Sequence, residues 1–239
     1  YIYSIFFLLL NPKKIYMDNL TLLIPAKHES ESLPRVLYEL EKYNCKKLIV
    51  MADDDLDTID ALKKFDCEIL FQNKKGYGSA LIEGINQIKT DYLCIFNADG
   101  SFDPKYLKPM LDECINGNDF VFASRYSLNG KTDDDTFLTF IGNKIFSAIG
   151  NIFFKLNIDD ILFTFVMGES QSFKDIKLKN LDFRFCVELP IKAKRNYKKY
   201  TNIGSHERKR FGGFKKVNEF KDGFLILLEL VRLFLIRKN

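Results

Sequence analysis

From residue 20 onward the chain alternates short apolar runs with segments of helical spacing. The apolar runs have the length of buried strands and lie at residues 21–26, 47–52, 68–72, 92–98 and 119–124. The intervening segments place apolar residues at helical spacing and cover about 31–43, 57–65, 78–89 and 104–115. Such alternation requires crossover connections, so we expect an α/β fold with a mostly parallel sheet and helices on both faces.

The alternation ends after about residue 126. Residues 129–136, "NGKTDDDT", combine turn residues with charge and predict a loop. A long helical segment follows at 138–154, then the run 159–168, and then mixed helix and strand. We therefore expect one α/β domain over residues 17–218.

Both ends of the chain are apolar. "YIYSIFFLLL" is too short to span a bilayer and lacks the charged start and cleavage site of a secretory signal. Since the first methionine is Met17, we interpret residues 1–16 as an upstream, non-native or disordered segment. Residues 219–239 predict an apolar helix interrupted by Glu229 and Arg232, which are costly at a bilayer centre. This helix either lies in the membrane interface, the option we favour, or packs on the core.

Charge and cysteine content narrow the function. A net charge of +4 is too small to indicate a nucleic-acid partner, and we expect none. The excess gathers in residues 191–216, which either form a solvated face or meet phosphates. The five cysteines form no C-x-x-C pair, which argues against a disulfide framework or zinc knuckle and favours a reducing, cytosolic setting.

Polar side chains follow the first two predicted strands. Ligands of parallel sheets bind at the carboxyl ends of the strands. Pro25 and Ala26 lead directly to His28 and Glu29. The loop after the second strand holds a run of acids whose like charges raise one another's pKa, so it is either solvated or bound to a cation or to the donors of a base and ribose. These acids are Asp53, Asp54, Asp55 and Asp57.

Glycine and acidic residues follow the third and fourth strands. Gly76 and Gly78 open a helix, but position 81 is Leu, so the dinucleotide fingerprint is incomplete and close backbone approach to a ligand is the better interpretation. "YLCIFNADGSFDP" brings Asn97, Asp99 and Asp103 to the next strand end. Mg²⁺ or Mn²⁺ needs only one or two protein carboxylates when a diphosphate supplies other oxygens. Asp99 is the expected metal ligand, Asp103 a weaker second, and Asn97 is free to donate to a sugar or phosphate oxygen.

Taken in order, "TLLIPAKHESESL", "VMADDDLDT", "KKGYGSALIEGI", "YLCIFNADGSFDP" and "FASRY" resemble a family 2 glycosyltransferase of the GT-A type. The chain is most similar to the polyprenyl-phosphate (dolichol-phosphate) mannose or glucose synthases. Asn97-Ala98-Asp99 stands at the metal motif, and Ala123 to Tyr126 match the Gly-Ser-Arg-Tyr element. Glu188 matches the Glu-bearing helix, and "RFGGFKK" matches the Arg-x-x-Gly-x-Ser-Lys element.

The resemblance implies a role for each matched residue. Those expected to bind the nucleotide are Pro25, Ala26, His28, Glu29, Asp53, Asp54, Gly76, Asn97 and Ala98. Those expected to be catalytic are Asp99, Asp160, Arg125 and Arg210. The acceptor phosphate is expected at Arg125, Arg210 and Lys216.

The resemblance also implies the reaction. A hexose passes, with inversion, from a donor of the GDP-mannose or UDP-glucose type to a polyprenyl phosphate or another lipid or glycan acceptor, assisted by Mg²⁺ or Mn²⁺. A polyprenyl phosphate is already an anionic nucleophile, whereas a sugar hydroxyl would need Asp159 or Asp160 as base. We expect a cytoplasmic protein bound peripherally to the cytoplasmic face of the membrane.

Four departures from the family pattern leave two alternatives. His28 replaces Asn, Asn97 replaces an acid, Lys215 replaces Ser, and Thr164 to Val166 replace Gly-Phe-Arg. Asn97 admits a catalytically silent GT-A module that binds only nucleotide or membrane. A sugar nucleotidyltransferase is the other alternative, although "AKHESES" stands where its Gly-rich loop would follow the first strand.

Overall fold

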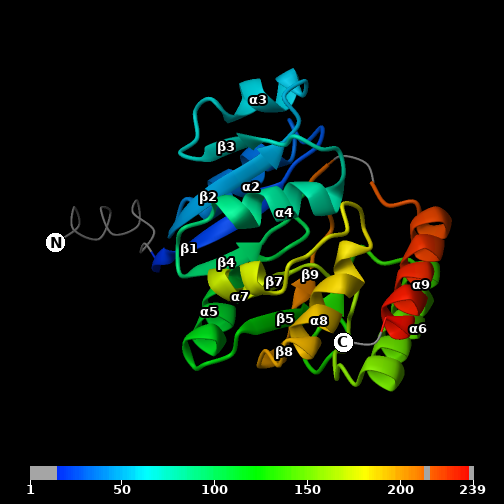
Figure 1. Cartoon of the computed structure of the whole chain (residues 1–239). Coiled ribbons are helices and arrows are strands. Elements are labelled where there is room, and N and C mark those ends of the chain that lie inside the picture. Colours follow the sequence, from blue (N-terminus) through cyan, green and yellow to red (C-terminus); the bar gives the residue numbers. More distant parts are fainter. Residues whose placement is uncertain (1–14, 213–215, 237–239) are drawn as a thin grey trace.

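A seven-stranded sheet organises the protein (Figure 1). The computed structural model describes residues 15–212 and 216–236. The strand order is β3-β2-β1-β4-β7-β5-β8, and every neighbouring pair is parallel except those of β7, which is antiparallel to β4 and β5. The strands are β1 (Ile15–Pro25), β2 (Tyr43–Met51), β3 (Glu68–Phe71), β4 (Tyr92–Ile95), β5 (Phe120–Ser124), β7 (Val166–Glu169) and β8 (Tyr200–Gly204). The mostly parallel sheet predicted from the sequence is confirmed.

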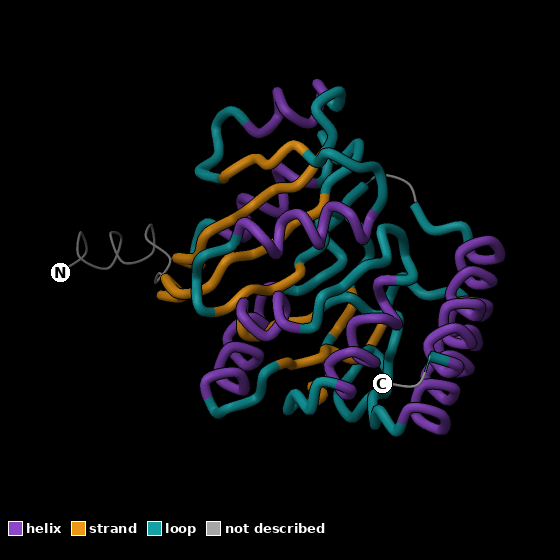
Figure 2. Tube along the Cα trace, in the orientation of Figure 1, coloured by secondary structure: helices purple, strands orange, loops and turns teal. Residues whose placement is uncertain are grey.

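Helices cover both faces of the sheet (Figure 2). They are α2 (Leu33–Leu40), α3 (Leu56–Leu62), α4 (Tyr77–Gln87), η1 (Pro104–Tyr106), α5 (Leu107–Ile115), α6 (Phe137–Phe154), α7 (Ser170–Asp175), α8 (Phe185–Arg195) and α9 (Glu219–Leu235). Two short strands, β6 (Lys131–Thr132) and β9 (His206–Glu207), pair outside the main sheet.

The central strands feed two hydrophobic cores because successive strand side chains point to opposite faces. In β1, Leu22 and Ile24 join the core beneath α2 and α5, while Leu23 joins the core beneath α4, α8 and α9. Cys94 and Ile95 of β4 divide in the same way. Strands that are buried on both faces read as continuous apolar runs, which is why the sequence located them.

Two element boundaries differ from the sequence-based expectation. Strand β1 begins at Ile15, before Met17, and its first residues pair with the start of β2 at Tyr43. Helix α2 ends at Leu40 rather than near residue 43, because Tyr43 and Cys45 are buried with the period of two that suits a strand. Residues 1–14 lie outside the described part of the chain.

Helices α6 and α9 lie side by side at one end of the molecule (Figure 1). The ring of Phe234 in α9 meets that of Phe153 in α6 with centroids 5.4 Å apart. The inner face of α9 buries Ile226, Leu230 and Leu233 in the core. The C-terminal helix therefore packs on the domain while its outer face stays exposed.

Candidate active site

A cavity of about 980 Å³ opens at the carboxyl ends of β1, β2 and β4. Parallel strands bring their carboxyl ends to one edge, so polar residues far apart in sequence meet there. Asp53 is not among the lining residues, and Asp54 and Asp55 are. The other residues expected to bind the nucleotide all line the cavity, namely Pro25, Ala26, His28, Glu29, Asp54, Gly76, Asn97 and Ala98.

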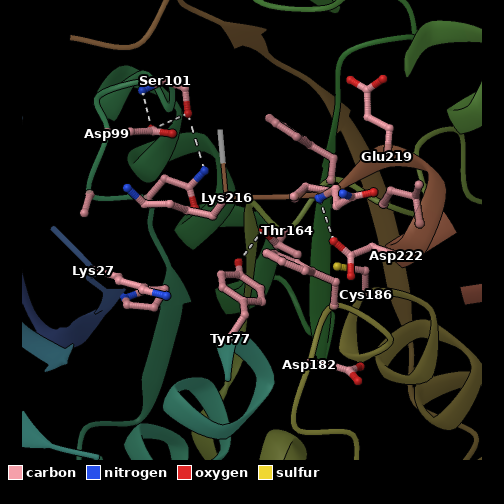
Figure 3. Close-up of a pocket in the computed structure, with 18 of the residues that line it drawn as sticks. Lys27, Tyr77, Asp99, Ser101, Thr164, Asp182, Cys186, Lys216, Glu219 and Asp222 are labelled. Carbon is pink, nitrogen blue, oxygen red and sulfur yellow. Dashed lines mark hydrogen bonds between the residues drawn. The ribbon is translucent and has the colours of Figure 1, made fainter. Parts of the chain in front are cut away.

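Asp99 is fixed at the polar end of the cavity (Figure 3). Its Oδ1 accepts from the Ser101 N–H at 3.0 Å and from the Ser101 hydroxyl at 2.7 Å. The amide of Asn97 donates to the same hydroxyl at 3.4 Å. Within residues 15–212 and 216–236 no partner is found for Oδ2 of Asp99. One oxygen is thus oriented by its loop, and the carboxylate lines the cavity.

The donor set suits a metal that arrives with a diphosphate. Across the described ranges, no three His, Cys, Asp or Glu side chains gather closely enough to hold a metal by themselves. Mg²⁺ and Mn²⁺ prefer oxygen ligands and bind through one or two carboxylates plus substrate phosphates. Asp99 supplies one such carboxylate, and Asn97 stands beside it with an amide.

Asp103, the weaker metal candidate, is placed elsewhere. Its carboxylate accepts from the Lys105 N–H at 3.0 Å, caps the 3₁₀ turn η1, and pairs with the Lys105 ammonium at 2.9 Å. It does not line the cavity. The geometry gives Asp103 a capping role.

Part of the acidic loop after β2 is structural. Asp55 is buried, and its Oδ2 accepts from the backbone N–H of His28 at 2.6 Å. Burial alone would raise the pKa of Asp55, but the bonds from His28 and Thr58 outweigh it, so the pKa lies below its usual value. Asp55 therefore holds the loop after β1 in place, a role that sequence reasoning did not assign.

Glu29 lies buried behind this loop. Burial raises its pKa, while the hydroxyl of Ser32 and the charge of Lys216 act in the opposite direction. The Lys216 ammonium lies 3.5 Å from Glu29 Oε1. Lys216 thus reaches the nucleotide edge from the chain segment that leads into α9.

Arg125 is enclosed by carboxylates. Its guanidinium binds Asp160 through Nε at 2.7 Å and Nη2 at 2.9 Å, and Glu207 through Nη1 at 3.2 Å. Burial alone would lower the pKa of Arg125, but Asp160 and Glu207 raise it. Arg125 and Asp160 are both expected from the sequence to be catalytic. In the structure they form an ion pair with each other.

Arg210 lines the cavity and pairs with Asp134 at 2.5 Å, a contact that raises the pKa of Arg210. Asp134, Asp135 and Glu207 also line this region, and sequence reasoning missed all three as site residues. The "DDD" run of the 129–136 loop was the available signal for the first two. Gly213 and Lys215 lie outside the described residues.

The other end of the cavity lies between α6 and α9. Apolar side chains line it, namely Leu138, Phe146, Leu162, Phe183 and Ile226, together with polar and charged ones, namely Asn143, Glu219, Lys221 and Asp222. Sequence reasoning placed the helix at 138–154 but gave it no function, although Lys144 is its single charge between Phe137 and Phe154. That composition was the signal for an apolar surface.

The fold and the cavity define a glycosyltransferase of the GT-A type. Residues 21–177 match the family described as glycosyl transferase family 2, and the chain belongs to this family. Membership of this family makes it a glycosyltransferase and argues against the alternative of a sugar nucleotidyltransferase.

Curated relatives share this class. The chain is 23% identical over 218 residues to glycosyltransferase AglJ of Haloferax volcanii, covering 90% of this chain and 72% of AglJ. It is 29% identical over 113 residues to an uncharacterized glycosyltransferase of Mycobacterium bovis, covering 47% of this chain and 51% of that protein. The match thus spans about half the length of the mycobacterial relative.

Solved structures share the fold. Glucosyl-3-phosphoglycerate synthase from Mycobacterium tuberculosis, in complex with Mn²⁺, UDP and glucosyl-3-phosphoglycerate, superimposes with a TM-score of 0.70 at 11% identity, covering 92% of this chain and 81% of that one. Mannosyl-3-phosphoglycerate synthase from Rubrobacter xylanophilus gives 0.67 at 14%, covering 89% and 72%.

Proposed function

We propose that the protein transfers a hexose, with inversion, from a nucleotide-diphosphate sugar to a polyprenyl phosphate at the membrane surface. The donor is of the GDP-mannose or UDP-glucose type, and Mg²⁺ or Mn²⁺ assists. One observation carries the proposal: a single cavity runs from the polar strand ends at Asp99 to a slot between α6 and α9, where apolar side chains such as Phe146 and Ile226 line it together with charged residues at the start of α9. A sugar nucleotide suits the first end, and a lipid chain suits the second.

The donor end is supported by the residues around Asp99. When bound, the metal would be held by Asp99 and the donor's diphosphate, and it would offset the charge that develops on the leaving nucleotide. The carboxylates of Glu29 and Asp54 offer hydrogen-bond acceptors to the base and ribose, and the imidazole of His28 offers a donor. The complex of glucosyl-3-phosphoglycerate synthase with Mn²⁺ and UDP-glucose shows that this fold holds such a donor in another protein.

The acceptor end is supported by charge and by space. Arg210 and Lys216 line the cavity, and a lipid phosphate would compete with Asp134 and Glu29 for these two cations. Gly142 and Gly223 line the slot from α6 and from α9, and a Cβ at either would meet nothing within 4 Å. The slot is therefore open where the two helices face it.

Helix α6 is polar inside and apolar outside. Its buried residues are Asn143, Ser147 and Gly150. Its exposed residues include Phe137, Ile145, Ile152 and Phe153. This inverted pattern suits a helix whose outer face meets lipid.

The outer face of α9 continues this surface with Phe224, Leu228, Val231 and Leu235. Among the helices of residues 15–212 and 216–236, α6 is the one long and apolar enough to cross a membrane, a test that the core helices of other proteins also pass. Because the inner face of α6 lines the cavity, we propose that α6 and α9 lie in the interface on the cytoplasmic side.

A transfer assay tests the proposal. Labelled UDP-glucose or GDP-mannose is incubated with Mn²⁺ and one of three acceptors: polyprenyl phosphate, the matching polyprenol, or 3-phosphoglycerate. We expect label in the organic extract with the polyprenyl phosphate alone, because the alcohol lacks the anionic nucleophile. Equal transfer to 3-phosphoglycerate without lipid would contradict the lipid acceptor.

The second candidate is a catalytically silent member. Asn97, which leaves one carboxylate in the metal motif, favours it. Tight binding of UDP or GDP with no turnover of any donor would support this candidate over the enzyme.

A further inference from the structure

The loop between α7 and α8 joins two parts of the molecule that the proposed reaction uses. Asp182 and Phe183 of this loop line the cavity beside Gly76 and Tyr77. The same loop contacts α9 on its other side through Asn180. It is thus one wall of the cavity, held between the donor edge and the C-terminal helix.

On the donor side the contact is backbone to backbone. The N–H of Ser79 donates to the carbonyl of Leu181 at 3.0 Å. A Cβ at Gly76 would lie 2.1 Å from that carbonyl oxygen, and one at Gly78 would lie 2.2 Å from the carbonyl oxygen of Asn180. Because only glycine permits this approach, any shift of residues 180–182 moves the start of α4 as well.

Aromatic contact reinforces this side of the wall. The ring of Tyr77 stacks on that of Phe183 with centroids 5.0 Å apart. The Tyr77 hydroxyl meets that of Thr164 at 2.7 Å (Figure 3). Tyr77 is therefore fixed by the loop and by the segment before β7.

On the α9 side the contact is a buried polar bond. The side-chain amide of Asn180 donates to Oε1 of Glu229 at 2.9 Å, and both residues are buried. Glu188 accepts the backbone N–H of Asn180 at 2.8 Å and of Lys179 at 3.0 Å. Asn180 is thus held by its backbone to α8 and by its side chain to α9.

Hydrophobic packing alone does not explain a glutamate at position 229. It is 2% exposed and stands among Ile226, Leu230 and Leu233 on the inner face of α9. A carboxylate in that position is costly unless it is paired. Besides Asn180, it binds Nε of Arg232 at 2.7 Å, and Arg232 is half-exposed.

We propose that Glu229 is a positioning residue for the donor site. By holding α9 against Asn180, Glu229 fixes the position of the loop between α7 and α8. This loop in turn positions Gly76 and Tyr77. Glu229 itself does not line the cavity. The inference rests on the proposed nucleotide site, and it makes donor affinity depend on how α9 is seated, a coupling that acts equally in both directions.

Three variants and a calorimetric measurement test this role. The affinities of UDP and GDP are measured with Mn²⁺, well below the unfolding temperature of each variant. Glu229→Leu keeps the size and the helix but removes the acceptor for Asn180, and we expect roughly tenfold weaker nucleotide binding. Glu229→Gln keeps an acceptor oxygen and should bind within about twofold of the wild type. Arg232→Gln removes the ion pair and leaves Asn180 bound, so it should match the wild type.

A second substitution keeps the test decisive if Glu229→Leu folds poorly. Asn180→Leu removes the other partner of the same bond and should weaken nucleotide binding to the same degree. The double variant should be no weaker than either single one, since both break one contact. Additive losses, or a wild-type affinity in Glu229→Leu, would overturn the positioning role. A wild-type protein that binds neither nucleotide would instead contradict the donor site itself.

Discussion

Arg125 and Asp160 form a buried two-point ion pair. Nε of Arg125 lies 2.7 Å from Oδ2 of Asp160, and Nη2 lies 2.9 Å from Oδ1. The backbone N–H of Arg125 adds a third bond to Oδ2 at 3.2 Å. Asp160 thus ties the end of β5 to the segment before β7, and Arg125 is held as part of the scaffold.

Removing one partner of this pair should destabilise the protein. Asp160→Ala leaves the Arg125 charge buried, so we expect the free energy of unfolding to fall by about 3–5 kcal/mol in denaturant titrations. Asp159→Ala is the matched control, since Asp159 is exposed and should change stability by less than about 0.5 kcal/mol. Equal effects at the two positions would contradict the buried pair.

Glu207 should make stability depend on pH. Burial raises its pKa above the usual 4.5, although Arg125 and Thr132 act in the opposite direction. The folded state therefore binds the proton more tightly than the unfolded state, and its stability falls as the pH rises from 4.5 through the raised pKa. Glu207→Gln cannot titrate and should lack this component. The free energy of unfolding of the wild type, relative to the variant, should decrease over that window; a difference independent of pH would refute the raised pKa.

Filling the slot between α6 and α9 should slow transfer to the lipid and leave the affinity for the nucleotide unchanged. Gly142→Leu places a side chain in the open space between α6 and α9. We expect about tenfold slower transfer to a long polyprenyl phosphate, because overpacking costs on the order of 1–3 kcal/mol. The affinity for UDP or GDP should be unchanged. Ala148→Leu, on the exposed side of the same helix, is the control. If Gly142→Leu transfers to the long lipid as fast as Ala148→Leu does, the slot does not hold the chain.

We expect the outer face of α6 to bind the membrane. Ile152 is 70% exposed there, and Ile115 of α5, 58% exposed, provides the same substitution on another surface. Ile152→Glu should lower partitioning to anionic vesicles at least about tenfold, since burying one such side chain contributes about 1.5–3 kcal/mol. Ile115→Glu should float with vesicles as the wild type does. Equal losses for both would indicate a general effect of charge.

The sequence was sufficient for the parallel core of the fold. Runs such as 21–26 and 92–98 are apolar because their strands are buried on both faces, and they identify strands without further information. The antiparallel β7 could not be foreseen, since an apolar run carries no sign of strand direction. Which face of α6 would be buried also depends on tertiary packing.

The candidate site, like the fold, could be predicted from the sequence only in part. Asn97 and Asp99 could be placed beside His28 because carboxyl ends of parallel strands share an edge. The partners of Arg125 could not, since Glu207 is 82 positions away and its short strand follows no periodic pattern. Charges that pair across such distances are visible only in the folded chain.

Asp99, as the one carboxylate of its motif, is expected to support a metal-dependent nucleotide site. Calorimetric titration of UDP and GDP with and without Mn²⁺, on the wild type, Asp99→Asn and Asp103→Asn, tests it most directly. We predict that Mn²⁺ strengthens nucleotide binding in the wild type and in Asp103→Asn, and has no effect in Asp99→Asn. A Mn²⁺ effect that survives in Asp99→Asn would show that Asp99 does not hold the metal.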